Sequence, residues 1–324
     1  MGFGQKDSIY LYNGQILIGA VQSASLGAIS IDDIDLKIQS VKLYKIRRLR
    51  IYQLYKIGTL DKQMRYGLLD VSAKDGWISI RPDNSAPIEV PIIDINVLIP
   101  LNKQFFKRLD GNLSVGFSYA KSGGIGQINL STTAGFSTRL FDYQLQASEI
   151  GSIDSSRFSR DNENLQLFVD YELNHAWYLA GVLQYQRNLE LSIARRWIEM
   201  LGAGNKLVVR DAWQLLVLSG LSFSQEKSTA NVSSGLLLEI PLMFRFNFYK
   251  FHHPNIQIAS SQTAYFSLSE QGRVRYDGTT NFSWEIIRYF YFTISPYSSF
   301  DSKPPSESTT KFDFGIAMSI SYKF

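Results

Sequence analysis

Apolar and polar residues alternate strictly over the last thirteen positions of the chain. Every even position from 312 to 324 is apolar or aromatic, and every odd position is small or polar. Because side chains of a β-strand point alternately to its two faces, this segment has one continuous apolar face. A tilted strand of this length spans roughly 25–30 Å, the thickness of a hydrocarbon core. The pattern predicts a membrane-spanning strand, and the alternative is an edge strand of a soluble sandwich.

The same alternation recurs along the chain from about residue 109 onward. Clear runs occupy 113–119, 128–136, 165–173, 213–223, 236–248 and 274–286, and weaker runs lie near 143, 178, 200, 258 and 292. Together with the last segment they make twelve strands. Closed single-chain bacterial barrels use an even number of strands. We therefore predict an all-β protein with a 12-stranded antiparallel transmembrane β-barrel over residues 101–324.

The connections between these runs alternate in character. Tight turns are expected near 138–141, 174–176, 210–212, 252–255 and 287–289, and more polar connections at 155–162, 191–196, 226–233, 270–272 and 301–308. In bacterial barrels the short turns face the periplasm and the longer loops face outward. An even strand number then places the last residue and the first hundred residues together on the periplasmic side.

Composition favours a barrel over a helical membrane protein. No stretch supplies the roughly eighteen uncharged apolar residues of a membrane helix. The 21 Phe, 18 Tyr and 5 Trp provide rings of the kind found at membrane interfaces. The absence of cysteine excludes disulfides, thiolate metal sites and cysteine nucleophiles. The formal net charge of +4 is too small to indicate binding of nucleic acid.

The first hundred residues contain an internal repeat. Gly-Ala-Ile-Ser-Ile at 27–31 reappears as Gly-Trp-Ile-Ser-Ile at 76–80, and alternating apolar residues follow each copy. Candidate strands at 16–22 and 66–71 precede the two copies. Because three short strands bury little core alone, two copies packed together make a better domain. We predict a small periplasmic β-domain over residues 1–100, made of two related repeats at about 7–50 and 60–100.

The start of the chain resembles a known bacterial family. Residues 7–21 contain an Asp, alternating apolar residues, Asn-Gly and then Gly-Ala-Val. This order is similar to the opening of a family of unknown function whose members are labelled salt-induced outer-membrane proteins. The resemblance implies an N-terminal periplasmic β-repeat followed by an outer-membrane barrel. The chain departs from the family in its second β-repeat and in having no obvious Trp at the domain junction, and the family brings no established activity and no catalytic residues.

The aromatic residues of the last strand resemble a second bacterial feature, the signal by which outer-membrane proteins are recognised for assembly. The residues concerned are Phe312, Phe314, Tyr322 and Phe324. Outer-membrane lipids and the assembly machinery are therefore expected partners of the barrel during insertion.

A set of charged residues is predicted to face the barrel lumen: Asp170, Glu172, Glu239, Arg245, Arg273, Arg275, Asp277 and Glu285. Opposite charges on neighbouring strands can neutralise one another in a structural network. The alternatives are a path for solutes or ions, and acid–base catalysis by paired carboxylates. His175, His252 and His253 fall in predicted turns, and the adjacent pair points to opposite faces, which suits a shared metal poorly. No catalytic or metal motif is present, and no cofactor is expected.

The segment 42–65 is basic and amphipathic. Its candidate contact residues for a partner or for lipid headgroups are Lys42, Lys45, Arg47, Arg48, Arg50 and Lys56. Such a stretch can lie against anionic headgroups or dock an acidic periplasmic partner. The alternative is a solvated linker between the two repeats.

These features favour a non-enzymatic outer-membrane barrel that acts as an anchor or accessory subunit, with a periplasmic domain that binds other envelope proteins. The expected protein partner is periplasmic or resides in the outer membrane, and no nucleic acid is expected. A narrow passive channel for small solutes or ions is the alternative function. A barrel hydrolase is the third.

Overall fold

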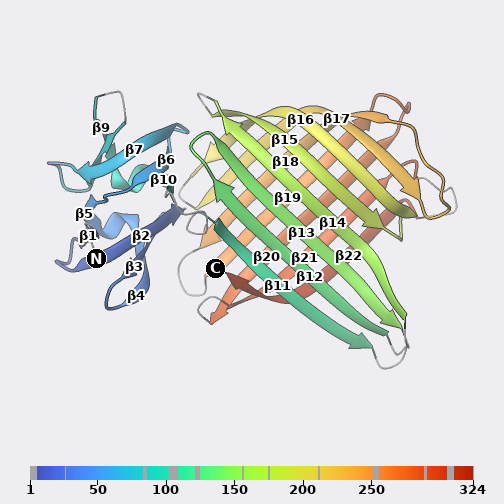
Figure 1. Ribbon diagram of the computed structural model, residues 1–324, viewed down its shortest axis with the longest axis horizontal. Helices are drawn as coiled ribbons and strands as arrows, with labels where there is room; N and C mark the ends of the chain where they lie inside the picture. Colours follow the sequence, from blue (N-terminus) through green and yellow to red (C-terminus); the bar gives the residue numbers. More distant parts are fainter. Residues whose placement is uncertain are drawn as a thin grey trace, which may run out of the picture.

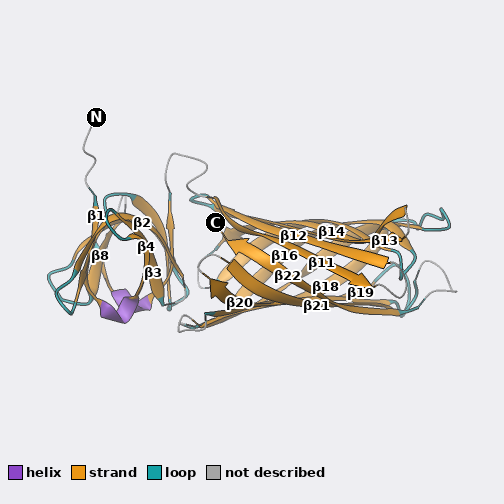
Figure 2. Ribbon diagram, turned by 90° about the horizontal axis from the view of Figure 1, so that it is seen from below, coloured by secondary structure: helices purple, strands orange, loops and turns teal. Residues whose placement is uncertain are grey.

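The computed structural model of the chain is built almost entirely of antiparallel β-strands, arranged as a small N-terminal domain and a barrel (Figure 1). It describes residues 6–25, 27–82, 86–101, 109–120, 125–154, 157–173, 176–210, 212–250, 255–287, 290–304 and 310–323. Among these residues, no helix is long and apolar enough to cross a membrane. Figure 2 shows the domain beside one end of the barrel.

The barrel closes on itself, as the alternation predicts. Each strand pairs antiparallel with the next, and the last pairs with the first at Asn112–Val115 and Ile320–Lys323. The described part of the chain has twelve such strands: β11 Leu109–Ala120, β12 Ile125–Ser137, β13 Phe141–Asp154, β14 Arg157–Glu172, β15 Trp177–Asn188, β16 Ile193–Val209, β17 Trp213–Ser228, β18 Leu237–Lys250, β19 Ile256–Ser267, β20 Val274–Ile287, β21 Phe290–Asp301 and β22 Phe312–Lys323. The predicted strand number is confirmed.

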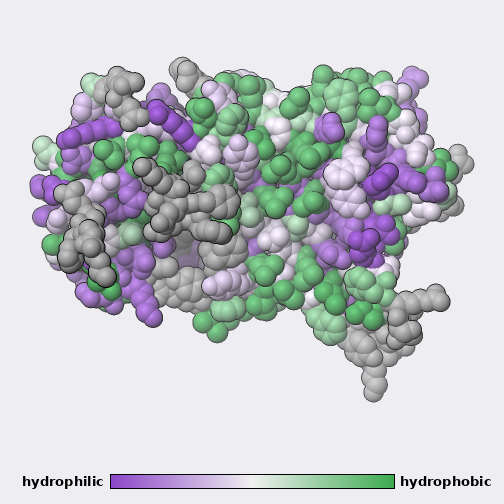
Figure 3. Space-filling model, in the orientation of Figure 1, coloured by the Kyte–Doolittle hydropathy of each residue, from purple (hydrophilic) through white to green (hydrophobic). Residues whose placement is uncertain are grey.

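The outer and inner faces of the barrel differ in polarity as the pattern requires. In β22, Phe314, Ile316 and Met318 are each more than half exposed, whereas Ser319 and Ser321 are buried inside. Leu201 on β16 is 74% exposed. In Figure 3, apolar residues cover much of the barrel while the N-terminal domain is more hydrophilic. A barrel with this exterior is a transmembrane barrel, because its apolar side chains match lipid and closure pairs every strand edge.

The two ends of the barrel have different connections. Short turns join β12 to β13, β14 to β15, β16 to β17, β18 to β19 and β20 to β21. The chain enters β11 and leaves β22 at this same end, and the N-terminal domain stands beside it (Figure 1). We call it the proximal end and the opposite one the distal end. Two distal connections are shorter than predicted. β14 begins at Arg157 and includes most of the polar segment 155–162, and β16 begins at Ile193 and includes most of the segment 191–196.

The N-terminal domain is a curled sheet with one core. Its described elements are β1 Asp7–Leu11, β2 Ile16–Ser25, β3 Ala28–Asp33, β4 Lys37–Lys42, η1 Leu43–Lys45, β5 Ile46–Arg50, β6 Leu54–Thr59, β7 Met64–Val71, β8 Trp77–Arg81, β9 Ile88–Pro91, η2 Ile92–Asp94 and β10 Ile95–Pro100, where η marks a 3-10 helix. The main strand order is β4-β3-β2-β10-β6-β7-β8-β9, and β1 pairs with β2 and β5. Ile9, Ile29, Leu49, Tyr55 and Ile57 are among the fully buried core residues.

The domain consists of two halves with the same order of elements. Each half has four strands, a 3-10 helix and a fifth strand, first in β1 to β5 and again in β6 to β10. Equivalent hydrogen bonds recur: the amide of Leu43 donates to Gly27 and that of Ile92 to Gly76, at 3.0 and 2.9 Å. The second half begins with β6, earlier than the boundary near residue 60 that the sequence indicates.

Glycine is required where strands approach closely at equivalent positions of the two halves. A Cβ on Gly19 would lie 1.9 Å from the carbonyl oxygen of Asp32, and one on Gly67 would lie 2.4 Å from that of Arg81. Both oxygens belong to backbone on the neighbouring strand, so a side chain at either position must displace a paired strand.

We expect Gly19→Ala to destabilise the N-terminal domain by about 1–3 kcal/mol, because the added methyl group meets backbone. Hydrogen exchange in the whole chain measures this as faster exchange of the β2 and β3 amides. Gly235→Ala is the control, since nothing lies within 4 Å of a Cβ there. Unchanged exchange in β2 and β3 would contradict the steric argument.

Candidate functional site

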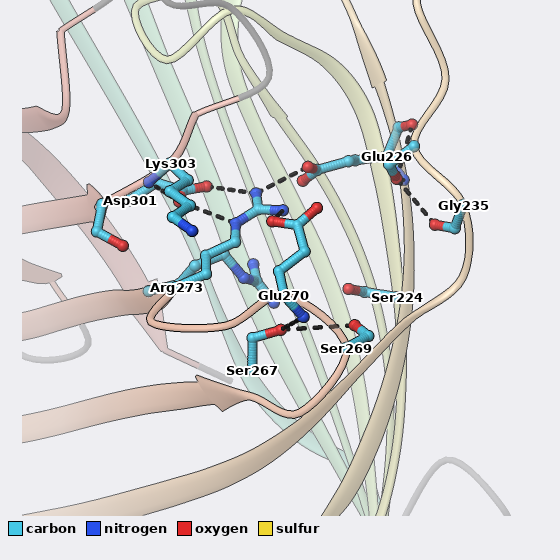
Figure 4. A network of polar contacts seen from close by, with 12 residues as sticks. Ser224, Glu226, Gly235, Ser267, Ser269, Glu270, Arg273, Asp301 and Lys303 are labelled. Carbon is cyan, nitrogen blue, oxygen red and sulfur yellow. Dashed lines mark hydrogen bonds and ion pairs between the residues drawn. The ribbon is translucent and has the colours of Figure 1, made fainter.

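A cluster of buried charges ties together strands on opposite sides of the lumen at the distal end (Figure 4). Arg273, just before β20, donates from Nη2 to Glu226 on β17 and Asp301 on β21, each at 2.7 Å. Arg196 on β16 donates to the same two carboxylates at 2.6 and 3.1 Å. These side chains are only 1–3% exposed. The cluster therefore connects β16 and β17 to β20 and β21 across the lumen.

A second ion pair lies beside this cluster. Arg275 on β20 donates from Nε to Glu239 on β18 at 2.8 Å, and its Nη2 also bonds that carboxylate. The guanidinium stacks on the ring of Tyr265, 4.5 Å from its centroid. We call the two together the distal ion cluster: Arg196, Arg273, Arg275, Glu226, Glu239 and Asp301. Its three cations match its three buried anions, as burial in a low-dielectric lumen requires. Arg273 also pairs with the more exposed Glu270 at 3.2 Å (Figure 4).

A carboxylate cluster lies at the proximal end. Asp142 on β13 is directly opposite Asp170 on β14, and Glu172 follows on the same strand. One oxygen from each of the three carboxylates lies within 4.8 Å of the other two, a spacing that suits a cation. Two lysine ammonium groups supply that charge: Lys206 donates to Glu172, and Lys56 of the N-terminal domain donates to Asp142, both at 2.5 Å. We call these five residues the proximal cluster.

The N-terminal domain is fixed to the barrel through its second half. Lys56 on β6 is fully buried in its pair with Asp142. Lys62, in the turn after β6, donates to the Leu207 carbonyl at 2.9 Å, and the Arg139 guanidinium lies 5.5 Å from the Tyr66 ring. Burial, together with the carboxylates of Asp142 and Glu172, raises the pKa of Tyr66 to about 12. These contacts attach the domain to the proximal end of the barrel.

Between the two clusters the lumen contains a cavity of about 390 Å³. Amides and hydroxyls dominate its lining, among them Asn129, Asn164, Gln166, Gln184 and Gln186. At roughly 30 Å³ per molecule, it has room for about a dozen waters. The cavity is thus polar but mostly uncharged.

The predicted lumen charges do not form one network. Glu239, Arg273 and Arg275 belong to the distal ion cluster, and Asp170 and Glu172 belong to the proximal one. Among the rest, Arg245 bonds Gln144 and stacks on Phe168, Asp277 accepts from Gln186 at 3.2 Å, and Glu285 bonds Asn255.

Sequence reasoning missed several members of both clusters. Arg196, Glu226 and Asp301 lie inside strands, but each stands next to a polar connection and was assigned to it. The signal that could have found Arg196 is its even position in the alternating pattern. It lies two and four residues from the buried Ile198 and Met200 and therefore shares their inward face of β16. Asp142 and Lys206 carried no comparable signal, because their partners come from distant segments.

The basic segment 42–65 is folded into η1, β5 and β6 rather than forming a linker. Lys45, Arg47 and Arg50 are exposed, and in the described part of the chain none of them has an ion-pair partner. Arg48 pairs with Asp75 at 2.7 Å, and Lys42 lies 6.0 Å from the Tyr44 ring. Lys56 differs from the prediction, because its burial against Asp142 removes it from any external contact surface.

The aromatic residues of the expected assembly signal face outward from β22. Phe312, Phe314 and Tyr322 are 56%, 58% and 45% exposed, and Tyr322 contacts the ring of Phe290. Phe324 and the three histidines lie outside the described residues.

Comparisons with known proteins match the chain to one family and to several solved structures. A family model described as a protein of unknown function, DUF481, matches residues 115–324. Similar solved structures include the translocator domain of autotransporter NalP from Neisseria meningitidis, at 12% identity over 67% of this chain and 87% of that chain, with a TM-score of 0.33. A bacterial polysaccharide outer membrane secretin shares 9% identity over 84% and 97%, with a TM-score of 0.35. A porin shares 11% over 98% of both chains, with a TM-score of 0.28. No curated protein matches the chain.

Arg273→Met is expected to destabilise the barrel by about 3–5 kcal/mol, because Glu226 and Asp301 then stay buried with half their compensating charge. Urea unfolding in detergent measures this as a lower midpoint at unchanged slope. Arg160→Met is the control: its side chain, paired with Glu163, is 58% exposed, so its loss costs less than about 1 kcal/mol. Equal midpoints for the two variants would contradict a structural role of the cluster.

Lys56→Met is expected to loosen the N-terminal domain from the barrel, because it leaves Asp142 without its ammonium partner. Since the chain has no cysteine, Lys62→Cys with Leu207→Cys provides a clean pair for a short bismaleimide cross-linker. Cross-linking should slow about tenfold when Lys56→Met is added. The exposed Lys45→Met is the control, and an equal rate in both backgrounds would show that Lys56 does not hold the domain.

Proposed function

The chain belongs to the DUF481 family of unknown function, and from this premise we propose that it is an outer-membrane β-barrel that anchors a periplasmic β-domain, which binds other envelope proteins. The proposal rests on a difference between the two halves of the N-terminal domain. Its second half is attached to the proximal end of the barrel, whereas its first half keeps an exposed basic strand.

The direction of that basic strand supports a protein partner over lipid headgroups. In Figure 1, β1 and β5 lie on the side of the domain away from the barrel, and β6 and β10 lie next to it. The basic strand β5 therefore lies on the side of the domain turned away from the barrel. Exposed cations in this position favour an acidic surface that approaches from the periplasm.

The interior supports an anchor more than an open pore. The domain is attached beside the proximal end by residues of β6, the turn after it and β7, and the distal ion cluster crosses the lumen at the other end. Because each buried charge in that cluster is matched, opening the path would require separating paired ions in a poorly solvated space. The proposal assigns no catalysis to the proximal carboxylates, since Asp142 and Glu172 are each paired with a lysine.

A narrow passive channel is the second candidate, and the polar cavity of about 390 Å³ favours it. Planar-bilayer recordings test it directly. Conductance steps in the intact chain would support a channel over an anchor, and a silent bilayer containing correctly folded barrel would count against the channel.

Gentle extraction of the intact protein from native membranes tests the anchor. We expect it to migrate with at least one other envelope protein, in an assembly larger than the 36.8 kDa chain and its detergent. Raising the salt concentration should weaken the assembly, because the exposed cations act through screened charge. A lone monomer at low salt, also after chemical cross-linking in intact cells, would contradict the proposal.

A further inference from the structure

The second half of the N-terminal domain meets the barrel with one defined face. On β6, Lys56 and Gly58 point outward, while Tyr55 and Ile57 point into the core. Across the sheet, Lys56 lies between Tyr66 on β7 and Ile99 on β10, and Gly58 lies between Met64 and Val97. We call these six residues the docking face. Through Lys56 and Tyr66 it contacts Asp142 and Arg139 of the barrel.

The first half presents the same face with different side chains. Ser8 on β1 lies between Ile18 on β2 and Arg50 on β5, in the way that Lys56 lies between Tyr66 and Ile99. Tyr10 lies between Ile16 and Arg48, at the positions of Gly58, Met64 and Val97. We call Ser8, Tyr10, Ile16, Ile18, Arg48 and Arg50 the free face.

The backbone supports this equivalence in detail. The pairing of β1 with β5 shifts register at Tyr10 and Leu11, and that of β10 with β6 shifts between Ile95 and Val97, the corresponding place. The turn after β1 and the turn after β6 have the same hydrogen bond. The amides of Gly14 and Lys62 each donate to the carbonyl three residues earlier, at 3.1 and 2.9 Å, and both residues have positive φ.

The free face is exposed and partly apolar. Ile16 and Ile18 are 53% and 43% exposed, and the neighbouring Ile34 and Leu36 are 55% and 58% exposed. The Asp33 carboxylate orders this neighbourhood by accepting from the amides of Ile18, Asp35 and Leu36. A contiguous, ordered apolar surface bordered by arginines is characteristic of an interaction site.

We propose that the free face binds an envelope protein whose contact surface has an apolar centre and carboxylates at its rim. This rests on the proposed function and names the site and its chemistry. A precedent for this contact lies in the same chain. The equivalent docking face places the cation of Lys56 against the acidic proximal cluster. Arg48 and Arg50 stand at the positions of Val97 and Ile99. Arg48 pairs with Asp75, so the exposed Arg50 is the cation that selects acidic groups along the β5 edge.

A second copy of the chain fits this face less well. Three cations without an ion-pair partner among the described residues stand on or beside β5, at Lys45, Arg47 and Arg50, while Arg48 pairs with Asp75. A two-fold partner would bring Asp32 and Asp35 from the opposite edge. Self-association therefore leaves positive charge unmatched on both copies, because a two-fold interface uses the same patch twice. A separate acidic partner balances it.

Site-specific photocross-linking in the intact protein, in native membranes, tests the assignment. A benzophenone amino acid replaces Ile18 on the free face and, as a matched control, Ile93, which is 50% exposed on η2 of the other half. We expect a protein adduct from position 18 and none from position 93. Mass spectrometry should map the attachment to a segment with Asp or Glu beside apolar residues.

Charge variants give the second readout. Arg50→Glu should lower the yield of the position-18 adduct about tenfold, whereas Arg50→Lys should retain most of the yield. Replacing the mapped partner carboxylates by lysine should restore the yield in the Arg50→Glu background. An adduct with a second copy or with lipid alone, or one indifferent to Arg50→Glu, overturns the inference. A partner that co-purifies but cross-links only from position 93 also overturns the inference. In that case the proposed anchor function would still hold. If no partner co-purifies with the wild-type chain and neither position cross-links, the proposed function fails as well.

Discussion

Backbone hydrogen bonding in a solvent without water is the constraint on which the rest of the structure depends. Hydrocarbon offers no partner for an unpaired N–H or C=O group, so a sheet that crosses it must close. The pairing of β22 with β11 satisfies this requirement. Closure then fixes the sorting of side chains, because alternate residues must face lipid and lumen. The apolar exterior and the polar interior are two results of the same geometry.

A closed barrel of this size must also fill its interior with groups that tolerate partial burial. The chain does so with amides and hydroxyls in the middle and with ionic clusters near the two ends. The distal ion cluster is neutral as a whole and joins strands that are not neighbours, which braces the wall. At the proximal end one of the two cations, Lys206, belongs to β16, and the other, Lys56, comes from outside the barrel. The contact that positions the domain therefore also compensates part of the negative charge at this end of the barrel.

The sequence predicts the parts of this fold that depend on local periodicity. Two-residue alternation identified the twelve strands, because each strand carries the pattern in its own residues. The even number of strands then placed the N-terminal domain and the end of the last strand at the same end of the barrel. The alternation did not predict the partners of buried charges. Lys56 and Asp142 are 86 positions apart, and nothing near either residue marks the pair. Arg196, Glu226 and Asp301 were assigned to connections, because polar residues at strand ends resemble loops until the neighbouring strands are in place.

The duplicated domain connects these observations. Two copies of one β-unit share a core, so each copy keeps the same inward residues and is free to change the outward ones. In the second copy, Lys56 and Tyr66 adapted that outward face to the acidic end of the barrel. In the first copy the same positions hold Ser8 and Ile18, with arginines alongside, and the face stays open. An exposed apolar surface lowers solubility unless a partner covers it. If the proposed partner binds the first half, the attached second half fixes the position and orientation at which that binding takes place.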